Sequence, residues 1–272
     1  MTTSYLFVPG SRPDRFEKAL TAGADRVIVD LEDAVSPEDK ASARDGLCAV
    51  LAGGLSGPVL VRVNAADTPW FADDLSALAS VLAVRPRALA GVVIPKLEEP
   101  QTVARVRAEL PLGEGDVVGL IETAVGVHAA DQLAASGVTR LAVGAIDLSV
   151  DLGADIDSPV LDATYARLVI ASRVAGIDAP LGSPPVDIHD AAAIESAARR
   201  LRGMGIGGQL CIHPAQLPAV HAGFAPTVAQ VDWARRIVAS EGAAVQVDGQ
   251  MVDKPVRDRA ERILAAADRS RA

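Results

Sequence analysis

Short runs of apolar, mostly β-branched residues alternate with longer amphipathic stretches along most of this 272-residue chain. Each short run is typical of a strand, and we expect eight of them, at residues 5–8, 26–30, 59–63, 91–95, 117–121, 140–143, 177–180 and 209–212. Most of these runs show no polar alternation, as in strands that are covered on both faces. The stretches between them have helical character, at residues 13–22, 40–51, 101–109, 126–135, 161–175 and 190–204.

This alternation predicts a parallel sheet with helices on its outside. Eight strand units with helices between them favour an α/β fold closed into a (β/α)8 TIM barrel. A doubly wound open sheet is the alternative, but no G-x-G-x-x-G pattern follows the first strand. Residues 232–241 and 255–267 predict two further helices that a barrel does not need. We therefore expect a barrel domain over residues 1–225. Residues 226–272 would be a helical extension of that domain that lies over the barrel mouth or reaches a neighbouring subunit.

Composition narrows the partners of such a chain. Apolar residues make up 50% and charged residues 22%, which excludes a disordered chain. The net charge of −9 without a basic stripe argues against nucleic acid, so an anionic ligand would need a local Arg, Lys or metal cation. The apolar segment 76–95 is interrupted by Arg85, Pro86 and Arg87, so we expect no membrane span. Two distant cysteines and the lack of a signal-peptide pattern predict a cytoplasmic protein.

Polar side chains follow nearly every predicted strand at its C-terminal end, and in a barrel these ends converge on one mouth. They are Ser11 and Arg12, Asp30 with Glu32 and Asp33, Arg62 with Asn64, Lys96, Glu122, Asp147 and His213. Glu122 and Asp147 follow adjacent predicted strands, and two neighbouring carboxylates repel unless a cation lies between them. Ligation by one or two carboxylates and water suits Mg²⁺. The alternative is that each acid caps the helix that follows or is simply solvated.

The roles of Arg62 and His213 each have two interpretations. Arg62 lies in an apolar strand, where its rigid fork would bind a carboxylate or an enolate oxygen, or form a structural salt bridge to Asp30 or Glu32. His213 is either a general base or, as we favour, part of a turn that closes the last strand.

The first predicted helix carries a weaker signal for anion binding. Ser11 and Asp14 have the spacing of a capping box, with Ser11 at the N-cap. The helix N-terminus together with Arg12 and Lys18 would form a phosphate site. A solvated basic face explains the same residues equally well.

Eight ordered motifs carry a family likeness over nearly the whole chain. They are LFVPGSRPDRFEKA, VIVDLEDAVSPEDKASAR, VLVRVN, VVIPKLE, LIETAVGV, GAIDLSVDLG, CIHPAQ and GQMVDKPV. The sequence resembles the citrate lyase beta-subunit-like proteins, which are CoA-ester lyases of the HpcH/HpaI aldolase superfamily. The resemblance implies a barrel enzyme that forms trimers or hexamers. It also implies Mg²⁺-dependent cleavage or formation of a carbon–carbon bond in a 3-hydroxyacyl-CoA thioester, such as malyl-CoA or citramalyl-CoA, with an acyl-CoA and a 2-oxo acid as the products.

The resemblance also implies roles for residues that match the family motifs. Glu122 and Asp147 would be the direct Mg²⁺ ligands, whereas Glu32 and Asp33 would hold metal-bound waters. Arg62 would stabilise the enolate oxygen of the thioester.

The remaining implied roles concern CoA, the neighbouring subunit and the substrate. Phe7, Arg12 and Lys18 would contact CoA, and Asp253 of a neighbouring subunit would be a general acid/base over the site. Many relatives carry an acid where this chain has Ile146, which implies a different orientation of the substrate near that backbone. Two alternatives stay open: a citrate lyase-type subunit that acts on a carrier-protein thioester, and a class II 2-oxo acid aldolase that needs no CoA.

Overall fold

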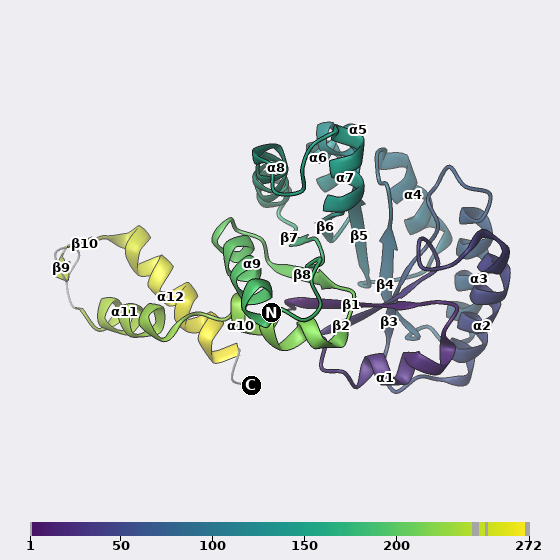
Figure 1. Cartoon of the computed structure of the whole chain (residues 1–272), viewed down its shortest axis with the longest axis horizontal. Coiled ribbons are helices and arrows are strands. Elements are labelled where there is room, and N and C mark those ends of the chain that lie inside the picture. Colours follow the sequence, from purple (N-terminus) through teal and green to yellow (C-terminus); the bar gives the residue numbers. More distant parts are fainter. Residues whose placement is uncertain (1, 241–244, 248–249, 270–272) are drawn as a thin grey trace.

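The chain folds into a closed barrel of eight parallel strands in sequence order (Figure 1). The computed structural model describes residues 2–240, 245–247 and 250–269. The barrel strands are β1 (Ser4–Pro9), β2 (Arg26–Asp30), β3 (Val59–Arg62), β4 (Leu89–Ile94), β5 (Asp116–Ile121), β6 (Arg140–Val143), β7 (Asp178–Gly182) and β8 (Gly208–Cys211). Pairing of β1 with β8 closes the barrel. The predicted (β/α)8 TIM barrel is confirmed.

Aliphatic side chains are buried on both faces of the strands. In β2, Val27 and Val29 belong to the layer between strands and helices, whereas Ile28 belongs to the barrel interior. The interior cluster consists of Tyr5, Ile28, Leu60, Val93, Val118, Leu120, Ala142, Leu181 and Leu210. This double burial explains why the strand sequences lack polar alternation.

Helices surround the barrel. They are α1 (Phe16–Leu20), α2 (Lys40–Gly53), α3 (Phe71–Val84), α4 (Pro100–Glu109), α5 (Ala124–His128), α6 (Ala130–Ala134), α7 (Ala145–Leu152), α8 (Pro159–Ala175), α9 (Ala191–Gly203) and α10 (Leu217–Phe224), with 3₁₀ turns η1 (Pro13–Arg15), η2 (Pro37–Asp39) and η3 (Pro214–Gln216). The sequence pattern does not predict α3, α7 or α10. The apolar residues of α3 and β4 are separated by only four residues, 85–88, and only Gly144 separates β6 from α7. No helix in the described part of the chain is long and apolar enough to cross a membrane.

A helical arm follows the barrel. It consists of α11 (Val228–Ala239), the short antiparallel strands β9 (Val245–Val247) and β10 (Gln250–Val252), and α12 (Lys254–Arg269). The arm extends away from the barrel, at the left of Figure 1. Its own apolar cluster joins α11 to α12 through Val231, Ala234, Ile237, Val252, Ala260 and Ile263. The division into residues 1–225 and 226–272 stays a prediction.

Helices α9 and α10 pack so closely that one glycine cannot carry a side chain. A Cβ at Gly223 would lie 2.5 Å from Ala198 Cβ and 2.7 Å from the Glu195 carbonyl oxygen. We expect Gly223→Ala to destabilise the fold by about 1–3 kcal/mol because overpacking forces these helices apart. The control is Gly46→Ala in α2, where a Cβ meets no atom within 4 Å. The control should stabilise the protein by about 0.5–1 kcal/mol. Equal changes in denaturant midpoint for the two variants would contradict this packing argument.

Candidate active site

A pocket of about 390 Å³ opens at the C-terminal ends of the strands. Its lining comes from seven of the eight strand ends and consists of Phe7, Pro9, Asp30, Asp33, Ala34, Arg62, Leu120, Glu122, Gly144, Ala145, Ile146, Asp147, Ser183, Pro184, Leu210 and Ile212. Wider crevices of about 550 and 710 Å³ lie at the other end of the barrel, beside the starts of β3 and β4. Active sites of this fold lie at the C-terminal end. The 390 Å³ pocket is therefore the candidate site.

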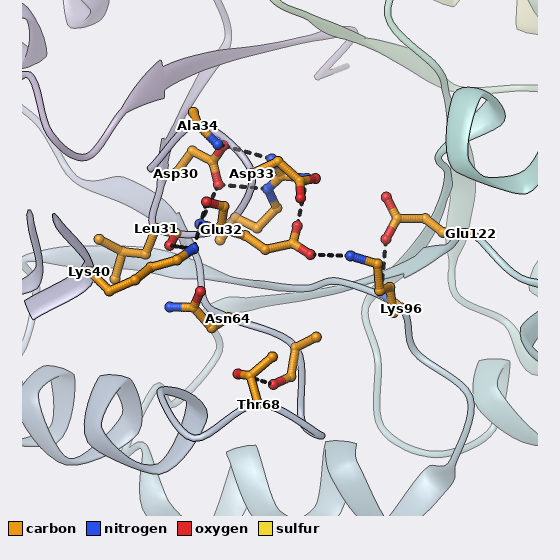
Figure 2. Close-up of polar contacts among 12 residues, drawn as sticks. Asp30, Leu31, Glu32, Asp33, Ala34, Lys40, Asn64, Thr68, Lys96 and Glu122 are labelled. Atoms are coloured by element: carbon orange, nitrogen blue, oxygen red, sulfur yellow. Dashed lines mark hydrogen bonds and ion pairs between the residues drawn. The ribbon is translucent and has the colours of Figure 1, made fainter. Parts of the chain in front are cut away.

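Arg62 pairs with three acids at the end of β2 and directly after it, of which Asp30 and Glu32 are buried and Asp33 is exposed. Figure 2 labels these three acids. Its Nε donates to Asp30 Oδ1 at 2.7 Å and its Nη2 donates to Asp30 Oδ2 at 2.6 Å, a bidentate pair. Its Nη1 lies 2.9 Å from Glu32 Oε2 and donates to Asp33 Oδ2 at 3.4 Å. Burial by itself would lower the pKa of Arg62, but the bonds to Asp30 and the charges of Glu32 and Asp33 raise it. The structural salt bridge is therefore present, and Arg62 also faces the pocket.

Asp30 determines the shape of the loop that follows β2. Besides binding Arg62, its carboxylate accepts the backbone N–H groups of Glu32 at 2.9 Å and Ala34 at 3.1 Å. From the other side, Lys40 Nζ donates to the carbonyl oxygens of Leu31 at 2.8 Å and Glu32 at 2.7 Å. These bonds satisfy the backbone of the loop and direct the acidic side chains toward the mouth.

Lys96 connects two acids that come from different strands. Its ammonium donates to Glu32 Oε1 at 2.6 Å, and its backbone N–H donates to Glu122 Oε2 at 2.9 Å (Figure 2). Partial burial of Lys96 would lower its pKa, but the bond to Glu32 outweighs this and raises it. The sequence alone indicates no role for Lys96. The signal was the Pro95-Lys96 pair at the end of an apolar strand.

Glu122 is a buried acid that keeps one oxygen toward the pocket. Only 3% of the residue is exposed, and burial, followed by the charge of Glu32, raises its pKa to about 8. Among the described residues, none donates a hydrogen bond to Oε1. A Cβ at Gly144 would lie 2.5 Å from Glu122 Cγ and from Oε1. Glycine is therefore required at position 144 for Glu122 to take this position.

Asp147 faces the same pocket from a helix rather than from a strand end. It lies in the first turn of α7, which begins at Ala145, directly after Gly144. An acid in the first turn interacts favourably with the helix dipole. In the described part of the chain, no residue donates a hydrogen bond to its carboxylate.

The donor set fits a divalent cation that keeps several waters. Within residues 2–240, 245–247 and 250–269, no three His, Cys, Asp or Glu side chains already converge on one point. The reason is that Glu32 and Asp33 turn toward Lys96 and Arg62, which leaves the open oxygens of Glu122 and Asp147. The site combines five carboxylates (Asp30, Glu32, Asp33, Glu122 and Asp147) with three cations (Arg62, Lys40 and Lys96). Once Glu122 has lost its proton, the deficit of two positive charges matches one Mg²⁺, which binds few carboxylates and keeps its waters.

The residues assigned to CoA are only partly at the pocket. Phe7 lines it and stacks under the Arg62 guanidinium, 4.9 Å from ring centroid to Cζ. Arg12 and Lys18 are exposed and do not line it, and the Arg12 guanidinium binds Asp14 with two bonds of 2.8 and 2.7 Å. The predicted capping box is wrong. Arg12, not Ser11, is the N-cap of η1, and the Asp14 carboxylate is taken up by Arg12.

Asp253 and His213 contribute to local caps. Asp253 Oδ1 accepts the Val256 N–H at 3.2 Å, and Asp253 lies between β10 and α12 in the sequence. Figure 1 shows β10 at the end of the arm far from the barrel. Its role over a neighbouring site stays a prediction. His213 Nδ1 accepts the Ala215 N–H at 3.2 Å, and Gln216 Oε1 accepts the His213 N–H. This arrangement is the structural turn that we favoured for His213.

The fold and the site define an α/β barrel protein with an acidic pocket at the C-terminal ends of its strands. The sequence model of the family described as HpcH/HpaI aldolase/citrate lyase matches residues 3–214. The chain belongs to this family, which confirms the predicted family. The citrate lyase subunit beta-like protein of Deinococcus radiodurans is 36% identical over 281 residues, which cover 96% of each chain. A (3S)-malyl-CoA thioesterase of Cereibacter sphaeroides is 32% identical, over 97% of this chain and 94% of the relative.

A solved structure extends the likeness to three dimensions. Protein CitE from Mycobacterium tuberculosis, in complex with magnesium, acetoacetate and coenzyme A, superposes with a TM-score of 0.83. The two chains are 33% identical, and the match covers 98% of each.

The raised pKa of Glu122 predicts a pH dependence of the metal-free protein. Folding raises this pKa from 4.5 to about 8, so the folded state keeps a proton that the unfolded chain releases. The free energy of unfolding should therefore fall as pH rises from 4.5 to about 8. Glu122→Gln cannot ionise, so with EDTA we expect it to exceed the wild type by about 1 kcal/mol or more at pH 9, and to lose this advantage near pH 5. Denaturant unfolding at the two pH values tests this, with the exposed Asp157→Asn as the control. Parallel pH profiles for wild type and Glu122→Gln would contradict it.

Proposed function

We propose that this protein is a Mg²⁺-dependent carbon–carbon lyase acting on a 3-hydroxyacyl-CoA thioester such as malyl-CoA or citramalyl-CoA. The reaction, in either direction, connects that thioester with an acyl-CoA and a 2-oxo acid through a thioester enolate. The observation that carries the proposal is the pair of open carboxylates, Glu122 and Asp147, beside Arg62 in one pocket. Support comes also from the relatives named for malyl-CoA and for a CoA complex.

In this proposal Glu122 and Asp147 would hold the metal, and Glu32 and Asp33 would hold its bound waters. When bound, Mg²⁺ supplies Lewis-acid polarisation of the substrate's carboxylate and hydroxyl oxygens. A base takes the proton of the substrate's hydroxyl group as the Cα–Cβ bond breaks, and Arg62 would stabilise the enolate oxygen that forms. Of its contacts, the 3.4 Å bond to Asp33 is the longest, so a substrate oxygen can replace it at the lowest cost.

The CoA moiety would leave the pocket past Phe7 toward the exposed basic residues of the first helical turns. Arg12 can exchange Asp14 for a phosphate at low cost, because 44% of the Arg12 side chain is exposed and water screens such exposed ion pairs. Lys18, on α1, would add a second cation. This placement favours a CoA thioester over a free 2-oxo acid aldol as the substrate.

Asp253 of a second copy would supply the proton that the pocket lacks. In a homotrimer or hexamer, the arm of one subunit would bring Asp253 over the mouth of the next, where it protonates the enolate carbon or, in reverse, removes a proton from the acyl-CoA. The exposed position of Asp253 on the arm supports this assignment.

A substrate screen with metal-ligand variants tests the activity. We expect purified protein with Mg²⁺ to release a 2-oxo acid from malyl-CoA or citramalyl-CoA. Glu122→Gln and Asp147→Asn should lower kcat/KM by about 10²-fold or more through loss of metal-based stabilisation, with circular dichroism unchanged. The exposed Asp157→Asn is the control. Parallel assays of free CoA detect hydrolysis, and activity restricted to a carrier-protein thioester would favour the citrate lyase-type subunit instead. Wild-type activity in Glu122→Gln would contradict the assignment.

Complementation tests whether two subunits build one site. Glu122→Gln and Asp253→Ala should each be inactive alone, since each removes one half of every site. The whole pool of oligomers from equal co-expression should regain about a quarter of the wild-type activity, because with random assembly that share of sites joins an intact barrel to an intact neighbouring arm. The two variants carry different affinity tags, and co-purification of both variants through either tag confirms mixing. Activity that stays at the level of the single variants would exclude Asp253 as a residue contributed by the neighbour.

A further inference from the structure

A single residue that follows β4, Lys96, holds both acids that flank the proposed metal position. Lys96 reaches Glu32 through its ammonium and Glu122 through its backbone N–H, at 2.6 and 2.9 Å. Figure 2 shows Lys96 between the two carboxylates. The acids belong to different parts of the barrel, since Glu32 follows β2 and Glu122 follows β5. The family motifs by themselves assign no role to this lysine.

The backbone at Lys96 is held in an unusual conformation. Its φ is +47°, and within the described ranges it is the one non-glycine residue in the left-handed region. Non-glycine residues persist there only where the surroundings hold them. The turn points the N–H of Lys96 at Glu122, and the next N–H, from Leu97, then donates to the Leu120 carbonyl at 3.0 Å. The strain therefore serves the attachment of Glu122.

The ammonium supplies charge that the buried acids need. Glu32 is 5% exposed, and its two oxygens face Lys96 and Arg62. Arg62 already serves Asp30 and Asp33 as well. Without the Lys96 ammonium, Glu32 would share one guanidinium with two other carboxylates.

We propose that Lys96 is the positioning residue of this site, a resident counter-cation that holds Glu32 and Glu122 in place before metal binds. The inference rests on the magnesium site of the proposed function. The positive charge of Lys96 stabilises the metal-free cluster, but it repels a divalent cation that enters beside Glu122. Lys96 therefore lowers the affinity for Mg²⁺ while it keeps the site assembled.

Lys96→Met and Lys96→Arg separate this role from a merely structural one. In Lys96→Met we expect the Kd for Mg²⁺, measured by calorimetry, to fall about tenfold because a neighbouring positive charge is removed. The melting temperature in EDTA should fall by several degrees, since Glu32 loses its partner. Lys96→Arg should restore both quantities to within about twofold affinity and about 1 °C of the wild type. Arg87→Met, an exposed cation beyond the other end of β4, is the matched control and should change neither.

Lys96→Gly isolates the backbone contribution. Glycine adopts φ +47° without strain and keeps the N–H that binds Glu122. We expect it to share the tighter Mg²⁺ binding of Lys96→Met and to melt at a higher temperature in EDTA than Lys96→Met does.

Several outcomes overturn the proposal. Unchanged or weaker Mg²⁺ binding in Lys96→Met would exclude the counter-cation role, as would an equal gain in Arg87→Met. A wild type that binds no Mg²⁺ would overturn the proposed metal site and the counter-cation role with it. In that case the EDTA melting temperatures of Lys96→Met and Lys96→Arg still decide whether the ammonium holds the acids: equal values would show that it does not.

Discussion

The bidentate pair of Asp30 and Arg62 is the interaction on which the mouth of the barrel depends. Both residues are buried, at 2% and 9% exposure, so neither charge is satisfied by bulk water. Loss of one partner of such a pair costs about 3–5 kcal/mol, because the other charge stays buried without compensation. Asp30 also binds two N–H groups of the loop that carries Glu32 and Asp33. One carboxylate thus orients the guanidinium and the acidic loop together.

This arrangement explains how an apolar strand can end in three acids. Arg62 from β3, Lys40 from α2 and Lys96 after β4 approach the segment from three directions. The cations come from α2, β3 and the segment after β4, so the acids are fully compensated only where β2, β3 and β4 lie side by side. The site is therefore a property of the tertiary fold rather than of the loop.

The sequence predicts the barrel well because each strand can be recognised from its own residues. A run such as Val27 to Val29 is buried on both sides whichever helix covers it, so its composition alone indicates a parallel strand. The apolar residues of β6 and α7 form one run, so the sequence does not show where the strand ends and the helix begins. For this reason the sequence predicts Asp147 at a strand end, although it lies in the first turn of α7. The capping box failed for a related reason: a guanidinium two residues away competes for the Asp14 carboxylate.

The acids of the site were predictable, but their partners were not. Glu122 is conspicuous after an apolar strand, whereas nothing in the residues around Lys96 indicates a left-handed backbone that donates to it. The sequence likewise does not indicate that position 144 must be glycine. That need arises only from the fold, which places Glu122 2.5 Å from the position of a Cβ at Gly144. An acid that interrupts or directly follows an apolar run can be recognised in the sequence. Donors and small residues are common everywhere, and only the three-dimensional contacts distinguish the ones that matter.

Proton transfer is the step that the pocket of one chain leaves open. Asp30, Glu32 and Asp33 are committed to Arg62 or Lys96, while Glu122 and Asp147 are the oxygens proposed for the metal. His213 uses Nδ1 to cap its own turn. Within the described residues, the pocket thus offers no acid that is both free of a cation and free of the metal. A lyase of the proposed kind needs such a group at the enolate carbon. The arm, with its own apolar cluster and an exposed Asp253, is the part of the chain suited to bring one from a second copy.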